Sequence, residues 1–305
     1  MDERLPSWRA SNAKSAILDF VDRVTRKRGP DFVPPEDRIA TFDNDGTLWC
    51  ERPLQPQFYF AKQRLEAFGH ADPALQARYP FKAFFDHDID KIKELGKQGV
   101  LEVVVAVHAG VTADKFDAIA GKWLREATNP KLGKRFVDLV YKPQLELLDL
   151  LRDNEFRCFI VSGGGMDVIR GFSEEAYGIP RENVIGSSGK TTLEERYGRF
   201  EIVKQAQLGS FDDREVKPQN IYLHIGRRPI LAFGNSDGDL AMLRYTLTGG
   251  GPALGLLLHH DDAEREFAYD REFILSPLAD ALDNADNYGL TLVSMKDDWE
   301  VVFPG

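Results

Sequence analysis

Short apolar runs alternate with amphipathic segments along most of this chain. Runs of this kind are typical of buried strands, and they occur at residues 39–42, 156–161, 183–186, 230–233, 253–258 and 290–294. Segments with apolar residues three and four apart indicate helices, and these lie at residues 13–24, 143–152, 167–177, 218–225, 240–245 and 279–286. Strands that alternate with helices predict an α/β fold with a doubly wound, mostly parallel sheet.

The pattern changes between the first and second of these strands. Helical periodicity continues there without an intervening strand, at residues 57–68, 81–99, 101–108 and 112–127. We therefore expect a helical domain at residues 51–139, inserted into a Rossmann-like core domain formed by residues 1–50 and 140–305. Residues 187–211 predict a short strand excursion with turns at Gly189 and Gly198.

Composition agrees with a globular protein that carries an insertion. The chain has 305 residues, of which 43% are hydrophobic and 29% charged, so it can build an ordinary core. Its two cysteines, Cys50 and Cys158, provide no disulfide framework. The start of the chain lacks the pattern of a signal peptide, and no apolar run reaches the length of a membrane span, so we expect a cytoplasmic protein. The sequence sets no expectation for the oligomeric state.

The net charge restricts the partners. A formal charge of −10 argues against nucleic acid or an anionic membrane as the main partner. If the substrate is a phosphate, the same charge requires a local positive group at the site, and a metal ion and a lysine are the candidates.

Three loops with polar or glycine-rich sequences each follow a predicted strand, at residues 43–47, 162–165 and 234–239. Ligands of doubly wound sheets bind beyond the carboxyl ends of the strands, so we expect the three loops to converge. In the first loop, Asp43 and Asp45 can point toward one pocket if the chain turns at Gly46. A plain turn rich in Asp and Asn is the alternative.

The other two loops suit an anion and a metal. The hydroxyl of Ser162 and the exposed amides beside it form an anion-binding arrangement, or else a simple glycine-rich connection. Residues 234–239 carry several oxygen-bearing side chains, which suit Mg²⁺. The alternative for this loop is that Asp237 only caps the following helix.

A lysine close to these loops is the remaining element. Lys217 precedes a predicted helix and becomes significant only if it reaches the phosphate, because an isolated lysine is usually on the surface. Charge alone does not separate it from Lys190 and Lys204.

Taken in order, these motifs resemble those of the haloacid dehalogenase-like hydrolase superfamily, in particular its phosphoserine phosphatase-like branch. The residues that carry the resemblance are Asp43-Asn44-Asp45-Gly46-Thr47, Ser162, Lys217 and Gly234-Asn235-Ser236-Asp237-Gly238-Asp239. The resemblance implies that residues 51–139 are a cap domain that closes over the site and selects the leaving group.

It also implies an activity and a mechanism. The chain is expected to be a magnesium-dependent phosphatase that hydrolyses a small phosphorylated metabolite. Asp43 would attack phosphorus and form an aspartyl-phosphate, and Asp45 would act as general acid and then as general base. Because other branches of the superfamily carry a different residue at position 45, Asp45 favours ester hydrolysis.

The resemblance assigns binding roles as well. Substrate would be bound by Thr47, Ser162, Gly163 and Lys217. Mg²⁺ would be held by the side chain of Asp43, the backbone carbonyl of Asp45 and Asn235, with Asp239 supporting the metal waters or Lys217. Asn235 stands where an aspartate is usual, so Asp237 is the alternative ligand.

Other features leave alternatives open. Glu51 is one position away from the glutamate that binds the substrate amine in phosphoserine phosphatases, so phosphoserine is not the expected substrate. Arg52 either favours an anionic leaving group or lies on the surface. His259 and His260 are expected to be structural. The alternative functions are another hydrolase or phosphotransferase of the same fold and a catalytically weak binding or regulatory member.

Overall fold

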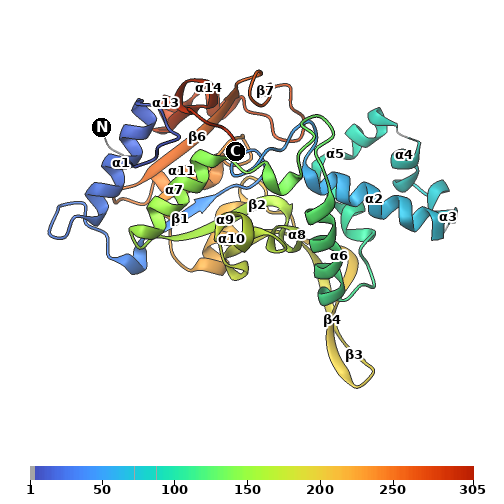
Figure 1. The fold of residues 1–305 in the computed structure, drawn as a ribbon. Coiled ribbons are helices and arrows are strands. Elements are labelled where there is room, and N and C mark those ends of the chain that lie inside the picture. Colours follow the sequence, from blue (N-terminus) through green and yellow to red (C-terminus); the bar gives the residue numbers. More distant parts are fainter. Residues whose placement is uncertain (1–3, 72, 87) are drawn as a thin grey trace.

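The computed structural model describes residues 4–71, 73–86 and 88–305 and is built around one sheet (Figure 1). The strand order is β4-β3-β2-β1-β5-β6-β7, and β8 also pairs with β6. The strands are β1 (Ile39–Phe42), β2 (Arg157–Gly165), β3 (Val184–Arg196), β4 (Arg199–Ser210), β5 (Leu231–Gly234), β6 (Leu254–Asp261), β7 (Ala268–Tyr269) and β8 (Thr291–Ser294). Pairing is parallel except between β3 and β4 and between β6 and β7. The predicted doubly wound, mostly parallel sheet is confirmed.

Helices cover both faces of the sheet because successive strand residues point to opposite sides. In β5, Leu231 and Phe233 enter one hydrophobic cluster, whereas Ala232 enters the other. The first cluster contains residues of α1 (Asn12–Thr25), α7 (Lys142–Asp153), α8 (Met166–Arg170), α9 (Ser173–Tyr177) and α14 (Met295–Asp298). The second contains residues of α10 (Val216–Ile225), α11 (Leu240–Leu247), α12 (Asp280–Asp283) and α13 (Ala285–Tyr288).

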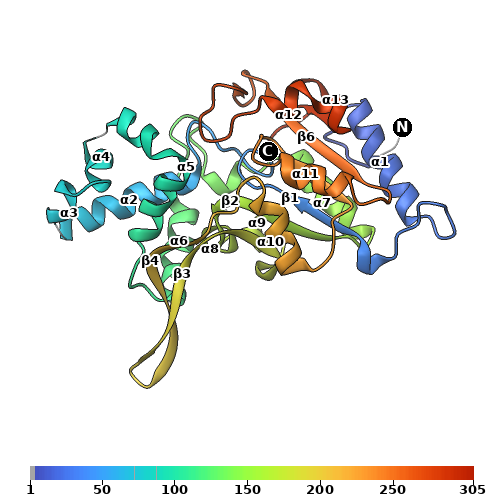
Figure 2. The same ribbon diagram turned by 180° about the vertical axis from the view of Figure 1, so that it is seen from behind.

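A helical block follows β1 and projects beyond one end of the sheet (Figures 1 and 2). It consists of α2 (Pro56–Ala71), α3 (Pro73–Ala77), α4 (Phe81–Phe85), α5 (Ile89–Ala106) and α6 (Ala113–Glu126). Leu65, Phe81 and Val103 belong to a separate small hydrophobic cluster within it. The break expected near residue 100 lies at Gly96, where the backbone of α5 is non-helical with φ of 64°, and residues 81–85 form the separate helix α4.

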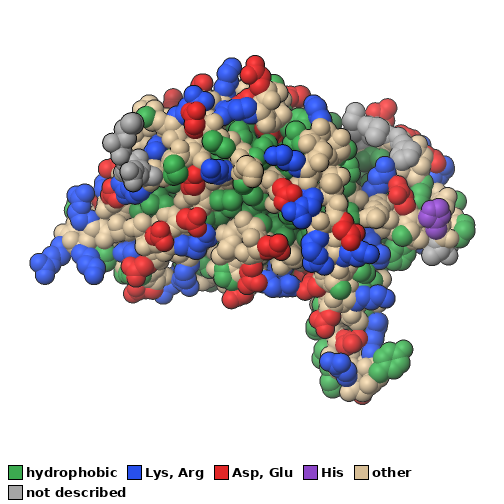
Figure 3. Space-filling model, viewed as in Figure 1, with side chains coloured by type: hydrophobic (Ala, Val, Ile, Leu, Met, Phe, Trp, Pro, Cys, Tyr) green, Lys and Arg blue, Asp and Glu red, His purple; other side chains and the backbone are tan. Residues whose placement is uncertain are grey.

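The strand excursion expected at residues 187–211 is present with its turn at Gly198, but it is longer than expected and the turn expected at Gly189 is wrong. Strands β3 and β4 form a long antiparallel ribbon that extends away from the body of the protein (Figures 1 and 3). Its tip turns at Tyr197 and Gly198, both of which have positive φ. At its base, the amide of Gly110 donates to the carbonyl of Lys204 at 2.8 Å, so the ribbon supports the helical block. No helix in the described part of the chain is long and apolar enough to cross a membrane.

Candidate active site

Adjacent strands bring the three loops to one edge of the sheet. β1 lies between β2 and β5 and is parallel to both. The amide of Asp43, the first residue after β1, donates to the carbonyl of Phe233 in β5 at 2.9 Å. Ser162 lies in β2, beside Val161, and Asn235 follows β5 directly. The convergence expected from the sequence therefore has a simple cause, which is parallel pairing of three short buried strands.

Lys217 links two of these loops. Its Nζ donates to Oδ1 of Asp43 at 2.7 Å, to Oδ1 of Asp239 at 2.6 Å and to the carbonyl of Val161 at 2.8 Å. An ammonium has three N–H donors, so each is used. Its side chain is 2% exposed. Lys190 is exposed, and Lys204 forms an ion pair with Asp167, so neither lysine competes for this position.

Charge in this group is not balanced. Burial acts to lower the pKa of Lys217, but the charges of Asp239 and Asp43 outweigh it and hold the pKa above its usual value. Burial raises the pKa of Asp43, and the charge of Asp239 raises it further, which together exceed the opposing effect of Lys217. The site therefore holds more carboxylate than one ammonium can neutralise.

The two oxygens of Asp45 have different surroundings. Oδ1 accepts a hydrogen bond from Nε1 of Trp49 at 2.7 Å, and the Trp49 ring stacks on Phe172 with centroids 4.5 Å apart. Oδ2 lies next to Gly164, where an added Cβ would be only 2.9 Å from it. Asp45 also lines, with Asp43 and Lys217, a small cavity of about 20 Å³. Oδ2 is thus the oxygen on the glycine-loop side of the carboxyl group.

The remaining residues expected to bind substrate divide into two groups. Ser162 and Gly163 line the same cavity, and Oγ of Ser162 accepts from the amide of Gly164 at 3.0 Å. Thr47 is fully buried and is not among the cavity-lining residues. Its hydroxyl donates to Oδ1 of Asn235 at 3.0 Å instead. The structure therefore places Thr47 as a support for Asn235 and not at the cavity.

The loop at residues 234–239 wraps around the carboxylate of Asp239. Oδ2 of Asp239 accepts from the amides of Asn235 and Ser236 at 3.0 Å each and from Oγ of Ser236 at 3.1 Å. Asp237 points elsewhere, because its carboxylate accepts from the amides of Ala279 and Ala281 at the start of α12. Asp237 is therefore used as a helix cap, whereas Asn235 lies beside Asp239, and neither of the pair is among the cavity-lining residues.

The contact of a buried carboxylate, Glu51, with Asn235 was not expected from the sequence. Glu51 is fully buried and accepts four hydrogen bonds. Oε1 accepts from Nδ2 of Asn235 at 3.1 Å and from the hydroxyl of Tyr269 at 3.0 Å, and Oε2 accepts from Nε2 of Gln55 at 2.9 Å and from Oγ of Ser276 at 3.0 Å. Burial raises the pKa of Glu51 to about 7. Its bond to Nδ2 leaves the amide oxygen of Asn235 on the side of Thr47.

Packing at Gly46 is tight enough to exclude any side chain. A Cβ there would lie 2.1 Å from Nδ2 of Asn235 and 2.5 Å from Oε1 of Glu51, and φ is +79°. The carbonyl of Gly46 lies 2.7 Å from Nε2 of His260, whose Nδ1 lies 3.2 Å from Oε2 of Glu266. His260 therefore holds the Asp43 loop from behind, as a structural residue does.

One more carboxylate that the sequence analysis missed lies at the cavity. Asp213 lines it, and a Cβ added at Gly238 would be 2.7 Å from its Oδ1. Asp213 precedes Lys217 by four residues and carries no motif, so only the fold identifies it. Arg52, in contrast, stacks its guanidinium over the rings of Tyr269 and Phe273 and does not line this cavity.

The donor set fits a divalent cation. Asp43, Asp45 and Asp239 are close together with one ammonium, and burial and the charge of Asp239 raise the pKa of Asp43. Within the described residues, no group of three or more His, Cys, Asp or Glu side chains has the arrangement of a metal site. Carboxylate, amide and carbonyl oxygens of these loops are nevertheless of the type that Mg²⁺ accepts.

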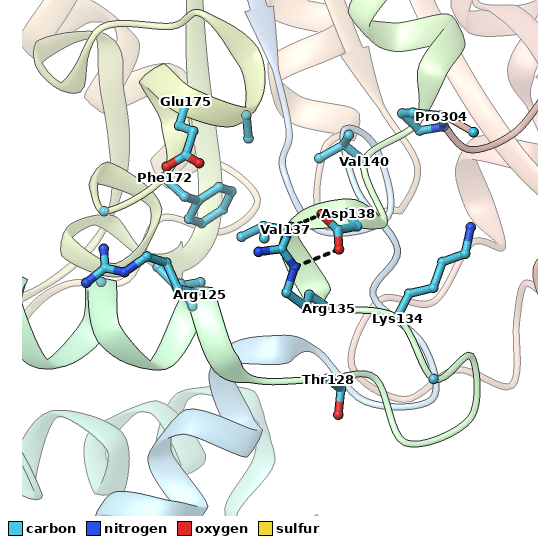
Figure 4. A pocket seen from close by; sticks show the side chains of 16 residues that line it. Arg125, Thr128, Lys134, Arg135, Val137, Asp138, Val140, Phe172, Glu175 and Pro304 are labelled. Atoms are coloured by element: carbon cyan, nitrogen blue, oxygen red, sulfur yellow. Dashed lines mark hydrogen bonds and ion pairs between the residues drawn. The ribbon is translucent and has the colours of Figure 1, made fainter.

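A much larger cavity lies apart from this chemistry. It has a volume of about 670 Å³ and lies between α6, the segment after it, α9 and the end of the chain (Figure 4). Its charged residues include Arg135 and Asp138, which are hydrogen-bonded to each other (Figure 4). None of the residues expected to act on substrate lines it.

Comparison with known proteins places the chain in a family. The family model for haloacid dehalogenase-like hydrolase matches residues 40–244. No curated protein matches the sequence. A solved structure of a protein of unknown function from Bordetella pertussis Tohama I is 16% identical with a TM-score of 0.54, covering 84% of this chain and 97% of that one.

Two further solved structures are similar. A conserved protein of unknown function from Anaerococcus prevotii DSM 20548 is 15% identical with a TM-score of 0.51, covering 82% of this chain and 86% of that one. A phosphoserine phosphohydrolase-like protein from Francisella tularensis subsp. tularensis SCHU S4 is 22% identical with a TM-score of 0.39, covering 74% of this chain and 89% of that one. The match of the family model spans more than half of the chain, which therefore belongs to the haloacid dehalogenase-like hydrolases.

Proposed function

We propose that this chain is a magnesium-dependent phosphomonoester hydrolase with Asp43 as its nucleophile and a small phosphorylated compound as its substrate. The observation that carries the proposal is the position of Asp43. Its carboxylate lies 2.7 Å from Lys217 at a polar cavity that Asp45 and Ser162 also line. A carboxylate, a second carboxyl group beside it and a buried ammonium are the groups that phosphoryl transfer to a protein side chain requires.

Two steps account for hydrolysis. The carboxylate of Asp43 attacks phosphorus, the bond between phosphorus and the leaving oxygen breaks, and Asp45 gives that oxygen a proton. Asp45 then removes a proton from a water molecule, whose oxygen bonds to phosphorus and displaces Asp43. The bond from Trp49 to Oδ1 of Asp45 directs the proton to Oδ2, on the Gly164 side.

Binding groups hold the phosphoryl oxygens during both steps. Ser162 offers a hydroxyl and Gly163 a backbone amide, and Lys217 offsets the repulsion between the phosphate and Asp43. Lys217 is fixed by Asp239 and by the carbonyl of Val161, so its position does not depend on the substrate.

The metal would be held by the carboxylate of Asp43, the backbone carbonyl of Asp45 and the amide oxygen of Asn235. Bound there, Mg²⁺ supplies positive charge that neutralises the phosphate and orients it for in-line attack. Thr47 bonds to the oxygen of the Asn235 amide and Glu51 to its nitrogen, and these contacts orient the amide as a metal ligand. The amide itself is uncharged.

The helical block at residues 51–139 would act as a cap over the core formed by residues 1–50 and 140–305. Support comes from the position of α2, which begins directly after the segment that contains Glu51 and Gln55. Residues from this block and from the glycine loop line a common cavity next to Asp45.

Hydrolysis of p-nitrophenyl phosphate tests the proposal. Activity should require Mg²⁺ and should fall at least about a thousandfold in Asp43→Asn. Asp153→Asn, an exposed change at the end of α7, is the matched control and should retain activity. Full activity in Asp43→Asn, or no hydrolysis of any phosphate ester by the wild type, would contradict the proposal. Mass spectrometry of the acid-quenched protein should show phosphate on the peptide that contains Asp43.

A further inference from the structure

A buried amide next to the catalytic carboxyl group has an unused donor. Gln57 lies in the first turn of α2 and is 7% exposed. Its Oε1 accepts from the amide of Gly165 at 2.6 Å, which fixes the side chain. Its Nε2 has no hydrogen-bond partner. A buried amide N–H without a partner costs free energy, so such groups commonly meet a ligand.

The unused N–H lies beside Asp45. The point at which a Cβ on Gly164 would stand is 2.4 Å from Nε2 of Gln57 and 2.9 Å from Oδ2 of Asp45. Both groups therefore border the same small space over the glycine loop. Since Oδ2 is the oxygen that would protonate the leaving alcohol, Nε2 lies where the atoms next to the ester oxygen would be.

Two small chambers meet at Gln57. One, of about 30 Å³, is also lined by Asp45, Phe58 and Phe211. The other, of about 50 Å³, is also lined by Phe60 and Phe116. Leu101, Val104 and Gly165 border both, so the two chambers are neighbours that lie between Asp45 and the helical block. A water molecule occupies roughly 30 Å³ of liquid, so together the chambers have room for a group of a few non-hydrogen atoms.

Apart from Asp45, the described residues that line the two chambers offer no net charge to a ligand. Lys204 forms an ion pair with Asp167, and its ammonium lies 4.2 Å from the centre of the Phe116 ring. His108 is buried, and burial lowers its pKa to about 4, so it is neutral near pH 7. A charged group on the leaving alcohol would lose its hydration here without a compensating partner.

We propose that Gln57 and these two chambers form the leaving-group subsite, and that it takes a small, uncharged alcohol with a hydrogen-bond acceptor close to the ester oxygen. The inference rests on the proposed phosphatase function and adds the class of leaving group. Nε2 of Gln57 donates to the acceptor, and the apolar walls contact the rest of the alcohol. An amino-acid leaving group, which carries an ammonium and a carboxylate, is excluded by the same walls.

A matched pair of substrates tests this proposal. 2-Methoxyethyl phosphate and butyl phosphate have leaving groups of equal length, and they differ by an ether oxygen in place of one methylene group. Wild type should prefer the ether in kcat/KM by about five- to tenfold, the value of one hydrogen bond. O-phosphoserine should be the poorest of the three substrates.

Variants at position 57 assign the preference to the amide. Gln57→Leu should bring the ratio of kcat/KM for the two esters close to one. Gln57→Glu should do the same, because it keeps an acceptor for the amide of Gly165 but has no N–H to donate. Gln63→Leu, an exposed change on the same helix, should keep the wild-type ratio. Because each ratio is measured within one protein, partial loss of folding does not affect it.

The outcomes separate this proposal from the function on which it rests. Equal hydrolysis of the two esters by wild type, a preference retained in Gln57→Leu, or faster hydrolysis of O-phosphoserine overturns the subsite, while activity that depends on Asp43 leaves the phosphatase standing. Absence of phosphatase activity on any ester, p-nitrophenyl phosphate included, overturns both.

Discussion

The two sides of Asp45 are built in opposite ways. On the side of Asp43, each N–H of Lys217 has an acceptor, and Glu51 accepts four hydrogen bonds. On the side of the helical block, Gln57 keeps an unpaired N–H, and much of the wall is aliphatic or aromatic. On the Asp43 side, the hydrogen bonds of Lys217 and Glu51 are already made. On the other side, the amide nitrogen of Gln57 has no hydrogen-bond partner.

This difference matches what each side has to recognise. Phosphate is the same in every ester, so a fixed array of charges can be organised for it in advance. The leaving alcohol varies, and its selection needs contacts that are favourable only when the correct group is present. Changes on the Asp43 side should therefore damage folding and catalysis together, whereas changes on the other side should alter selectivity or a local equilibrium.

The largest effect is expected for Lys217→Met. Removal of the ammonium leaves Asp43 and Asp239 buried next to each other without a counter-charge. We expect the free energy of unfolding to fall by about 3–5 kcal/mol and activity to be lost. Urea unfolding followed by circular dichroism measures the first, with exposed Lys190→Met as the control. An unchanged stability would show that the two sides do not differ in this way.

The next largest effect on stability is expected for Asn235→Asp. It places a second carboxylate 3.1 Å from Glu51, at the present Nδ2 position. Repulsion in a buried setting should lower the free energy of unfolding by about 2–3 kcal/mol. The double variant Asn235→Asp/Glu51→Gln reverses donor and acceptor while keeping the total charge, so it should recover at least half of the loss.

Isothermal titration with Mg²⁺ separates the roles of this pair. Glu51→Gln alone should weaken magnesium binding, because its amide has one acceptor oxygen in place of two for the four surrounding donors, which loosens the hold on Nδ2 of Asn235. The double variant should bind the metal at least as well as the wild type. Binding that is unchanged in Glu51→Gln would contradict a role for Glu51 in positioning Asn235.

In the helical block, we expect the free energy of unfolding to depend on pH through His108. The folded-state pKa of His108, about 4, lies below the ordinary value of 6.5, so the unfolded chain binds the proton more readily. Stability from this residue is complete above pH 6.5 and is lost as pH falls toward 4, by about 3 kcal/mol. In His108→Asn, whose amide can donate to the carbonyl of Val104, stability should fall less over that interval. Equal slopes in the two proteins would exclude His108 as the source.

The smallest effect belongs to a position outside both sides. Tyr197 is fully exposed at the tip of the β3–β4 ribbon and has φ of 53°. Tyr197→Asn places a residue that tolerates this conformation better and removes no packing. The free energy of unfolding should change by less than about 0.5 kcal/mol, and activity should be retained. A large loss of activity would mean that the ribbon takes part in the site.

Local patterns were sufficient for the sheet and for much of the site. The strands are short apolar runs, and Asp43, Ser162 and Asn235 were predicted as site residues from the loops that follow them, whereas Lys217 was singled out only by the resemblance. Parallel pairing then explains why they meet. The helical block was also visible, because its periodicity continues for some 70 residues without a strand.

Contacts between distant parts of the chain were not visible. Glu51 accepts hydrogen bonds from Tyr269 and Ser276, which lie more than 200 positions away in the sequence. No spacing rule connects these residues with Glu51. The sequence also does not show the direction of a side chain. Thr47 belongs to the motif, yet its hydroxyl turns to Asn235, whereas Gln57 belongs to no motif and lies beside Asp45.

The ribbon illustrates a different difficulty. Residues 187–211 contain turn signals at Gly189 and Gly198, which suggested a short excursion. In the structure Gly189 lies within β3, and only Tyr197 and Gly198 form the tip. The strand continues through Gly189, but its register with β4 shifts on both sides of this residue, so the glycine marks an irregularity in the ribbon and not a turn.

The bond between Gln57 and Gly165 also joins two parts of the molecule. It runs at 2.6 Å from the first helix of the block to the end of β2. If Gln57 selects the alcohol as proposed, the amide that does so is also one of the attachments of the block to the sheet. Substitutions at position 57 are then expected to alter selectivity and this attachment together.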